Sequence, residues 1–381
     1  MTLIQGGIVH DGRGHVGKMD VALENGRIAA VGPELAGCDG AEVIDASGCH
    51  VFPGFVSAVS TWGIAGPGWT GDDQAENSDP VTPQMDVTYA FDQDSMNFQK
   101  AYRYGVTSVL VTPRPINVLC GQAAVYKTAG KTPHGMLIKE KVAMMASVSA
   151  EVKRAFEKRN TAPMTHMGIF SLLKEQLEKA KRYDPKEGHD EALEALLPVL
   201  TGKTPLLVNC CTRAEAEAAL HLLSAYPDIR IILSGAYGLD ETTPGVQAGK
   251  VSVFMGDQTE AFLPDNRITQ FERIIPLMES GCPIAISCGG NDITGGRESL
   301  LWNALFWVRH GLSPERAVSC ITSVPADILG LSDRVGSIAP GLDADLSIWS
   351  DDPFVTYAAR VQHVFLSGTD VFLKEVYPSC W

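Results

Sequence analysis

The chain has 381 residues, of which 45% are hydrophobic and 20% are charged, as in a globular protein with a large core. Its formal net charge of −14 repels phosphate backbones and anionic lipid headgroups, which argues against nucleic acid and membrane surfaces as partners. No signal-peptide pattern opens the chain and its nine cysteines lack framework spacing, so we expect reduced thiols and a cytoplasmic location.

The hydrophobic pattern divides the chain into three parts. Residues 1–52 predict a small β module, because segments such as DVALENGRIAAVG alternate apolar and polar residues and break at Asn-Gly or Gly. Residues 53–341 alternate apolar strands with amphipathic helices, which predicts an α/β fold and fits a (β/α)8 TIM barrel. Residues 342–381 return to a β pattern, so we expect both chain ends to form one discontinuous β-sandwich domain. The charged stretch 174–197 predicts solvated helices.

Several segments carry a resemblance to a known family. The closing segment SVPADILGLSDRVGSIAPGLDADLSIW and the opening segments IVHDGRG, ENGRIAAVG and VIDASGCHVFPGFV match its pattern. On these segments the chain resembles the amidohydrolase superfamily, and within it the imidazolonepropionase-like and cyclic-amide hydrolase branch. GVTSVLVTP, GQAAVYKTAG and WVRHGLSPERAV extend the resemblance over essentially the whole chain. It implies hydrolysis of C–N bonds by divalent metal ions that activate water at the C-terminal mouth of the barrel.

The resemblance also implies where the metal ligands stand, and this chain has other residues there. The family's first strand reads Pro-Gly-Phe, an aliphatic residue, Asp, a small residue and His-x-His, and its later ligands lie at the ends of strands four, five, six and eight. Valine has no lone pair with which to bind a cation. We therefore expect no metal and no cofactor. The residues at the aligned positions are Ser57, Val59, Thr61, Ala150, Asn209, Cys211, Ser234 and Gly289.

Three other residues are candidates for a rebuilt site, each with an ordinary alternative. Asp292, in the glycine-rich segment GGNDITGG, could serve as a general base or could cap a turn. His166 stands where relatives tend to carry Arg near the mouth, or is a satisfied polar residue at a helix start. Lys127 could contact a ligand from a β excursion over the barrel, or face solvent from a strand.

The cysteines at two strand ends are further candidates. Cys210 or Cys211 ends the fifth strand and Cys288 ends the eighth, so two thiols could face each other as nucleophile or soft metal ligands. The alternative is that these thiols are inert packing in apolar strands.

Two functional hypotheses follow, and a third, purely structural role in assembly stays open. The first is a non-catalytic subunit that binds a small polar metabolite or a partner, as a homo-oligomer or with an intact amidohydrolase relative. The second is a metal-independent hydrolase or lyase acting on a C–N bond of a small cyclic amide. Its catalytic residues would be Asp292, His166 and Cys211, and its substrate-binding residues would be Ser57, Thr61, Lys127, Asn209, Ser234 and Cys288.

Overall fold

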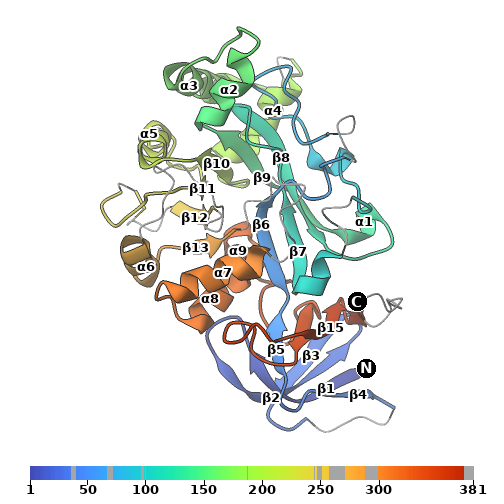
Figure 1. Ribbon diagram of the computed structural model, residues 1–381. Coiled ribbons are helices and arrows are strands. Elements are labelled where there is room, and N and C mark those ends of the chain that lie inside the picture. The colour runs from blue at the N-terminus through green and yellow to red at the C-terminus, as the bar shows by residue number, and fades with distance from the viewer. Residues whose placement is uncertain are drawn as a thin grey trace.

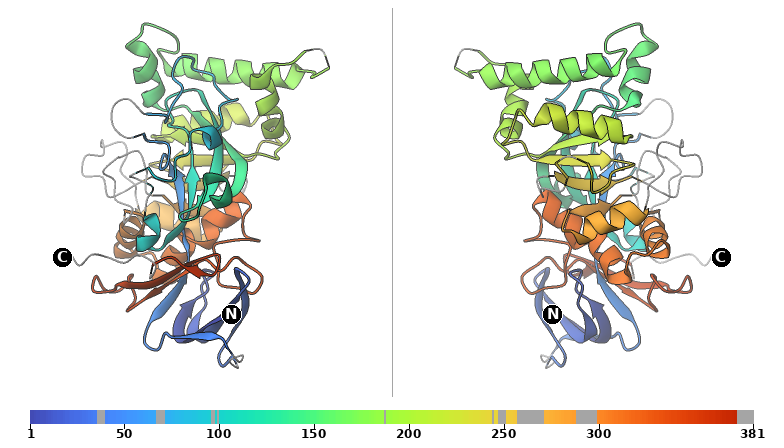
Figure 2. Two further views of the ribbon diagram at one scale, coloured as in Figure 1. Left: turned by 90° about the vertical axis from the view of Figure 1, so that its right-hand side faces the viewer. Right: turned by 90° about the vertical axis from the view of Figure 1, so that its left-hand side faces the viewer.

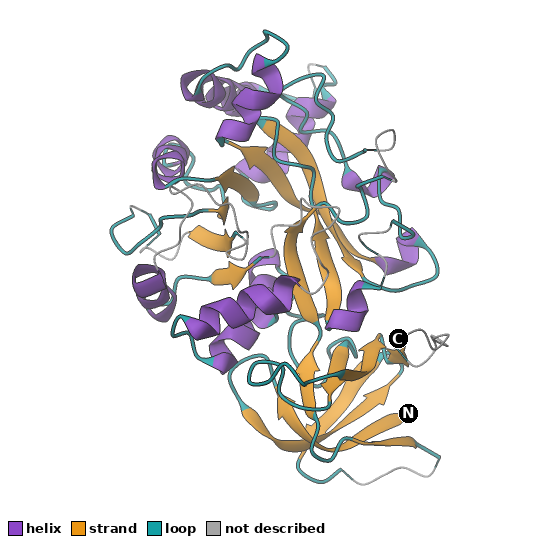
Figure 3. Ribbon diagram, in the orientation of Figure 1, coloured by secondary structure: helices purple, strands orange, loops and turns teal. Residues whose placement is uncertain are grey.

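The computed structural model describes residues 1–35, 40–66, 72–95, 98, 100–186, 188–243, 245–246, 251–256, 271–287 and 299–372. Its strands form two sheets of eight strands each, one in a small β domain and one in a barrel (Figure 3). The β domain lies at one end of the molecule, and the helices between residues 150 and 200 lie at the other end (Figure 1, Figure 2). The α/β fold class predicted from the sequence is confirmed.

The β domain combines strands from both ends of the chain, which lie side by side as blue and red ribbons in Figure 1. Strand β5 (His50–Pro53) joins the two sets, because it pairs in parallel with β1 (Thr2–His10) and antiparallel with β14 (Leu346–Trp349). The described strands of both chain ends thus form one hydrogen-bonded sheet, as expected for a discontinuous β domain. The other strands are β2 (Val16–Glu24), β3 (Arg27–Gly32), β4 (Glu42–Asp45), β15 (Val361–Leu366) and β16 (Thr369–Asp370).

Two glycines show how local sequence shapes this domain. Asn25 and Gly26 have φ angles of 51° and 79°, the left-handed values of a two-residue hairpin turn, and they join β2 to β3. Gly54 follows β5 and passes so close to Thr107 that a Cβ atom would lie 1.9 Å from its Oγ1. Only glycine therefore fits where the chain passes from the β domain into the barrel.

The second sheet is the wall of the barrel. Its strands are β6 (Phe55–Ser60), β7 (Val106–Val111), β8 (Leu119–Lys127), β9 (Leu137–Ser147), β10 (Leu206–Cys210), β11 (Ile231–Gly235), β12 (Val251–Met255) and β13 (Ile284–Ile286). They follow one another in chain order around the sheet. β8 runs antiparallel to its neighbours β7 and β9, whereas all the other neighbouring pairs are parallel. The expected set of eight parallel strands is therefore wrong at β8.

The edge strands β6 and β13 approach each other and nearly close the barrel. Ser287, directly after β13, donates its hydroxyl to the carbonyl of Ala58 in β6. Asn303 in α7 (Ser299–Arg309) donates its amide to the carbonyl of Ser287 at 2.5 Å. Within the described residues no ladder joins these two strands. Side chains therefore bridge the gap that backbone hydrogen bonds leave.

Helices cover the outer face of the wall. Outward residues such as Val208 and Leu233 pack against helices, whereas inward residues such as Leu207, Ile232 and Phe254 form a separate interior core. The predicted solvated stretch is the pair α3 (His166–Arg182) and α4 (Glu191–Leu200), whose charged residues are mostly exposed. The other helices are α1 (Pro133–Met136), α2 (Ala150–Glu157), α5 (Arg213–Leu223), α6 (Phe271–Glu279), α8 (Pro314–Cys320), α9 (Ser323–Leu329) and the 3-10 turns η1 (Val87–Tyr89) and η2 (Ala101–Tyr104).

Two findings concern membrane-spanning helices and cysteines. Among the described residues, no helix combines the length and apolar character that crossing a membrane requires. None of the described cysteines forms a disulfide. These cysteines are Cys49, Cys120, Cys210, Cys211, Cys282 and Cys320.

Candidate functional site at the barrel mouth

The carboxyl ends of the barrel strands bring small polar side chains together on the inner face. In β10 and β11, Leu207 and Ile232 point into the interior core, so Asn209 and Ser234, two residues later, share that face. Ser147 at the end of β9 is the register partner of Asn209. We call the region of Ser147, Asn209 and Ser234 the barrel mouth.

Hydrogen bonds connect the side chains of the mouth. The Nδ2 atom of Asn209 lies 3.4 Å from Oγ of Ser147, which lies 3.1 Å from Oγ of Ser149. The serines, including Ser234, are buried and Asn209 is half-buried. These four side chains offer hydrogen-bond donors and acceptors and carry no charge.

Strand β6 carries the positions of the family's first ligands. Ser57 is the register partner of Val109, a residue of the outer core, so Ser57 lies buried on the outer face and not at the mouth. Val59 packs against the interior core and has a φ angle of 55°, which β-branched residues rarely adopt. Thr61 follows the strand and is buried. The placement of Ser57 thus gives no support to a substrate-binding role.

Two predicted catalytic residues meet at a carboxylate that the sequence analysis did not single out. The Oε1 atom of buried Glu215 lies 3.0 Å from Nε2 of His166, the first residue of α3. The Oε2 atom accepts the backbone N–H groups of Cys211 at 2.7 Å and Thr212 at 3.1 Å. Thr212 and Glu215 form a capping box at the start of α5. The Glu215 carboxylate thus holds the turn after β10 in place. Cys211 contacts this carboxylate through its backbone N–H group.

Of the cysteine candidates, the structure describes Cys210 and Cys211. Cys210 is fully buried on the outer face, with its Sγ atom 3.7 Å from the carbonyl oxygen of Ser234. Burial raises the pKa of this thiol, so it stays protonated and unreactive at neutral pH. Cys288, Asp292 and Gly289 lie outside the described residues. The roles expected for Cys288 and Asp292 stay predictions.

Lys127 lies at the other end of the wall from the mouth. It pairs with Ser108 near the amino end of β7, where the barrel meets the β domain. Its Nζ atom lies 2.8 Å from Asp343, 2.9 Å from Asp345 and 2.7 Å from Oγ of Ser367. The solvent-facing alternative is wrong, because only 7% of Lys127 is exposed. A ligand contact is not supported, because two carboxylates and a hydroxyl already engage the ammonium group.

The residues at the aligned ligand positions do not fit the metal ion that the family resemblance implies. Val59, Thr61, Asn209 and Ser234 offer neither an imidazole nor a carboxylate. Ala150, the aligned residue for strand four, begins α2 and has no donor atom in its side chain. We therefore derive no catalytic step through a metal at these positions.

A potential ligand cluster does exist, but in the β domain. Within the described ranges, His10, His50 and Asp352 are the one group of three or more His, Cys, Asp or Glu side chains close enough to share an ion. His10 ends β1 and His50 begins β5, so the cluster belongs to the small sheet. The β domain adjoins the amino end of β6, whereas the mouth lies at the carboxyl ends of the barrel strands. The cluster is therefore separate from the mouth.

Comparisons with known proteins agree with this architecture. The model of the Amidohydrolase family matches residues 262–371. The crystal structure of an amidohydrolase from Thermotoga maritima MSB8 superposes with a TM-score of 0.87 at 28% identity, over 98% of this chain and 100% of that chain. The chain belongs to the amidohydrolase superfamily.

Two further relatives show how far the likeness extends within the amidohydrolase superfamily. Amidohydrolase tasK from Hapsidospora irregularis is 26% identical over 402 residues, which cover 93% of this chain and 40% of that protein. The chain thus spans two fifths of this curated relative's length. Molinate hydrolase is 17% identical with a TM-score of 0.59, over 97% of this chain and 94% of that one, which shows a shared fold alone.

Proposed function

We propose that this amidohydrolase-superfamily chain binds a small polar ligand at its barrel mouth without the family's metal ion, as a non-catalytic ligand-binding or partner subunit. The donor set at the aligned positions carries this proposal. A divalent ion needs several lone-pair donors at about 2 Å, and Val59 has none to offer. Hydroxyl and amide groups, as in Ser234 and Asn209, are poor substitutes for imidazole and carboxylate.

The chemistry of the mouth also supports a class of ligand. Asn209 supplies both an amide donor and an amide acceptor, and Ser147 and Ser234 supply hydroxyl groups. Such groups complement the N–H and C=O groups of a small cyclic amide or a related uncharged metabolite. A charged ligand would find no opposite charge among these three side chains. We therefore expect neutral, hydrogen-bonding ligands to bind best.

The length of the curated relative supports the partner-subunit part of the proposal. In that protein a segment similar to this chain occupies 40% of a longer polypeptide. In tasK, a region similar to this chain is therefore joined to further sequence. We infer that this chain works beside another protein, either a second copy or an intact amidohydrolase relative. Light scattering of the purified chain, alone and mixed with such a relative, tests this: a stable complex is expected, and monomers in both samples would contradict it.

Ligand binding is tested by calorimetry with a panel of small cyclic amides such as hydantoin. The matched variants are Asn209→Ala at the mouth and Ser57→Ala on the outer face of the wall. We expect Asn209→Ala to weaken binding at least about tenfold, because it removes the central hydrogen-bonding group. Ser57→Ala should bind like the unmodified protein. Equal losses in both variants, or no binding by any of the proteins, would overturn the ligand-binding proposal.

Hydrolysis assays separate this proposal from an enzymatic function. We expect no turnover of the panel, with or without added zinc or manganese. Turnover that requires an added metal would restore the family's chemistry and contradict the proposal. Turnover that persists after chelation, and disappears in Cys211→Ser or His166→Asn but not in Cys320→Ser, would instead establish a metal-independent enzyme built around Glu215.

A further inference from the structure

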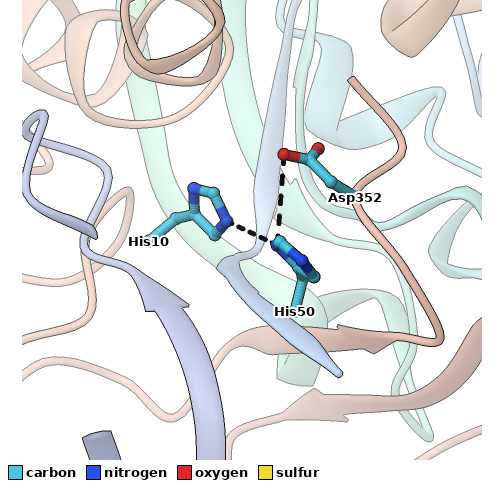
Figure 4. Close-up of side chains that lie close together, drawn as sticks. All are labelled: His10, His50 and Asp352. Atoms are coloured by element: carbon cyan, nitrogen blue, oxygen red, sulfur yellow. Dashed lines mark hydrogen bonds and ion pairs between the residues drawn. The ribbon is translucent and has the colours of Figure 1, made fainter. Parts of the chain in front are cut away.

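Three potential metal ligands meet in the β domain on the side that faces the barrel. Figure 4 shows the rings of His10 and His50 and the carboxylate of Asp352 turned toward one another. The Nε2 atom of His10 lies 2.9 Å from Nδ1 of His50, which lies 4.0 Å from Oδ2 of Asp352. All three donor atoms lie within 4.8 Å of one another. Segments far apart in the sequence therefore place three donors around one point.

The surrounding structure holds each donor in this orientation. The ring of His10 stacks on Phe52 with centroids 4.1 Å apart. The Oδ1 atom of Asp352 accepts the backbone N–H of Phe354 at 2.8 Å, which leaves Oδ2 turned toward His50. Only 7% of His10 is exposed, as are 16% and 15% of the side chains of His50 and Asp352. The donors are therefore oriented and largely shielded from water before any ion binds.

The distances lie close to those of a coordination site. Zinc binds imidazole nitrogen and carboxylate oxygen at about 2.0–2.2 Å, so two donors on one tetrahedral ion stand roughly 3.3 Å apart. The 2.9 Å and 4.0 Å separations differ from this by about 0.4 and about 0.7 Å. All three donor atoms lie within 4.8 Å of one another, so side-chain rotations would bring them to bonding distance of one ion. In the ion-free state the two imidazoles share a hydrogen bond, and an exchange of tautomers frees both lone pairs.

We propose that His10, His50 and Asp352 bind one divalent first-row transition-metal ion, and that this ion is Zn2+. Two neutral imidazoles and one carboxylate are a donor set that zinc favours, and water or a ligand completes the fourth position. This site is separate from the barrel mouth and does not depend on the function proposed there.

The position of the site indicates a structural task. Asp352 begins the turn that carries Phe354, whose ring packs against Phe52 and Phe55 with centroids 5.8 and 6.5 Å away. Phe52 belongs to β5 and Phe55 to the first barrel strand, β6. An ion bound to His10, His50 and Asp352 ties this turn to the β sheet. It therefore clamps the aromatic contact between the β domain and the barrel.

Calorimetry with Zn2+ alone, on the full chain after removal of metals with a chelator, tests this site. The variants are His50→Gln and Asp352→Asn, and the matched control is His363→Gln. His363 also pairs with a carboxylate in the β domain, with Nδ1 2.7 Å from Oδ2 of Asp370, but it is not part of the three-ligand group. We expect one Zn2+ per unmodified chain, at least about tenfold weaker binding in either ligand variant, and no change in His363→Gln.

A second readout keeps the test decisive if one variant folds poorly. Zn2+ should raise the melting temperature of the unmodified protein and of His363→Gln, and should leave that of Asp352→Asn nearly unchanged. Absence of zinc binding by the unmodified chain would overturn the proposal. Equal affinity in the unmodified protein and both ligand variants would also overturn it, because the ion would then sit elsewhere.

Discussion

At the scale of single residues, Lys127 is the clearest case of a side chain whose position sets its role. It is buried between Asp343 and Asp345 and links the barrel wall to the β domain. Lys127→Met would leave Asp345 as a buried carboxylate without its cation. We expect a loss of about 3 kcal/mol in the free energy of unfolding, measured by urea denaturation. Lys131→Met, at an exposed position, should change it by less than about 0.5 kcal/mol, and a similar loss in both variants would contradict this role.

The same cluster predicts a dependence on pH. Burial alone would raise the pKa of Asp343, but hydrogen bonds from Arg334 and Lys127 outweigh burial and lower it. A lowered pKa in the folded state stabilises the protein above the unfolded-state value and loses this effect as the pH falls through the folded-state value. Burial raises the pKa of Asp345, so this carboxyl group affects stability in the opposite direction to Asp343 as the pH falls. The effect of Asp343 is therefore best measured by comparing variants that differ only at one of its partners.

Removal of Arg334 isolates the contribution of Asp343. Arg334→Gln should shift acid unfolding to higher pH, because Asp343 then takes up a proton more readily. Arg13→Gln is the control, because Arg13 pairs with Asp327 at the surface, where ion pairs contribute little. The midpoint is measured by circular dichroism along a titration from pH 7 to strongly acid. An unchanged midpoint in Arg334→Gln would show that Asp343 is not held ionised by this partner.

At the scale of elements, strand β6 keeps a strained backbone at an aligned ligand position. Val59 has a left-handed φ angle of 55°, which costs an ordinary residue about 1–2 kcal/mol. Val59→Gly relieves this strain while losing a half-buried side chain, so we expect stability within about 1 kcal/mol of the original. Val56→Gly, in the same strand but fully buried, should cost at least about 2 kcal/mol more. Equal losses in urea denaturation would argue against strain at Val59.

The elements also show what the sequence could predict. The Asn25–Gly26 hairpin, the strand–helix alternation of the barrel and the solvated helices near residues 174–197 follow from local patterns, because turn chemistry and burial period act over a few residues. The direction of β8 does not follow, because a buried strand has the same apolar pattern whether it runs parallel or antiparallel. The order in which the strands of the β domain pair does not follow for a similar reason, because long-range pairing leaves no local signal.

The candidate site was predictable only where strand ends could be aligned. Asn209 and Ser234 lie at the mouth as expected, because their strands are regular. Ser57 was misplaced because the irregular register of β6 hides which face its residues occupy. Glu215 was missed, although Thr-x-x-Glu after a strand is a capping signal that could have indicated it.

At the scale of the whole molecule, two regions at opposite ends of β6 have different chemistry. The mouth, around Asn209, holds uncharged hydrogen-bonding groups, whereas the β domain holds the only close ligand group of the described residues, at His10, His50 and Asp352. A measurement of the metal content of the purified protein cannot show which of these two regions holds the ion. An ion bound by the purified protein has to be located before it says anything about catalysis.

The most direct test is therefore an anomalous difference map, recorded at the zinc absorption edge from crystals of the chain grown with Zn2+. Among the described residues, Val59, Asn209 and Ser234 supply no imidazole or carboxylate, which predicts no anomalous peak among the ends of β6, β10 and β11. The ligand cluster predicts a peak between His10, His50 and Asp352. A peak within bonding distance of protein side chains at the barrel mouth would contradict the proposal that this chain binds its ligand there without the family's metal ion.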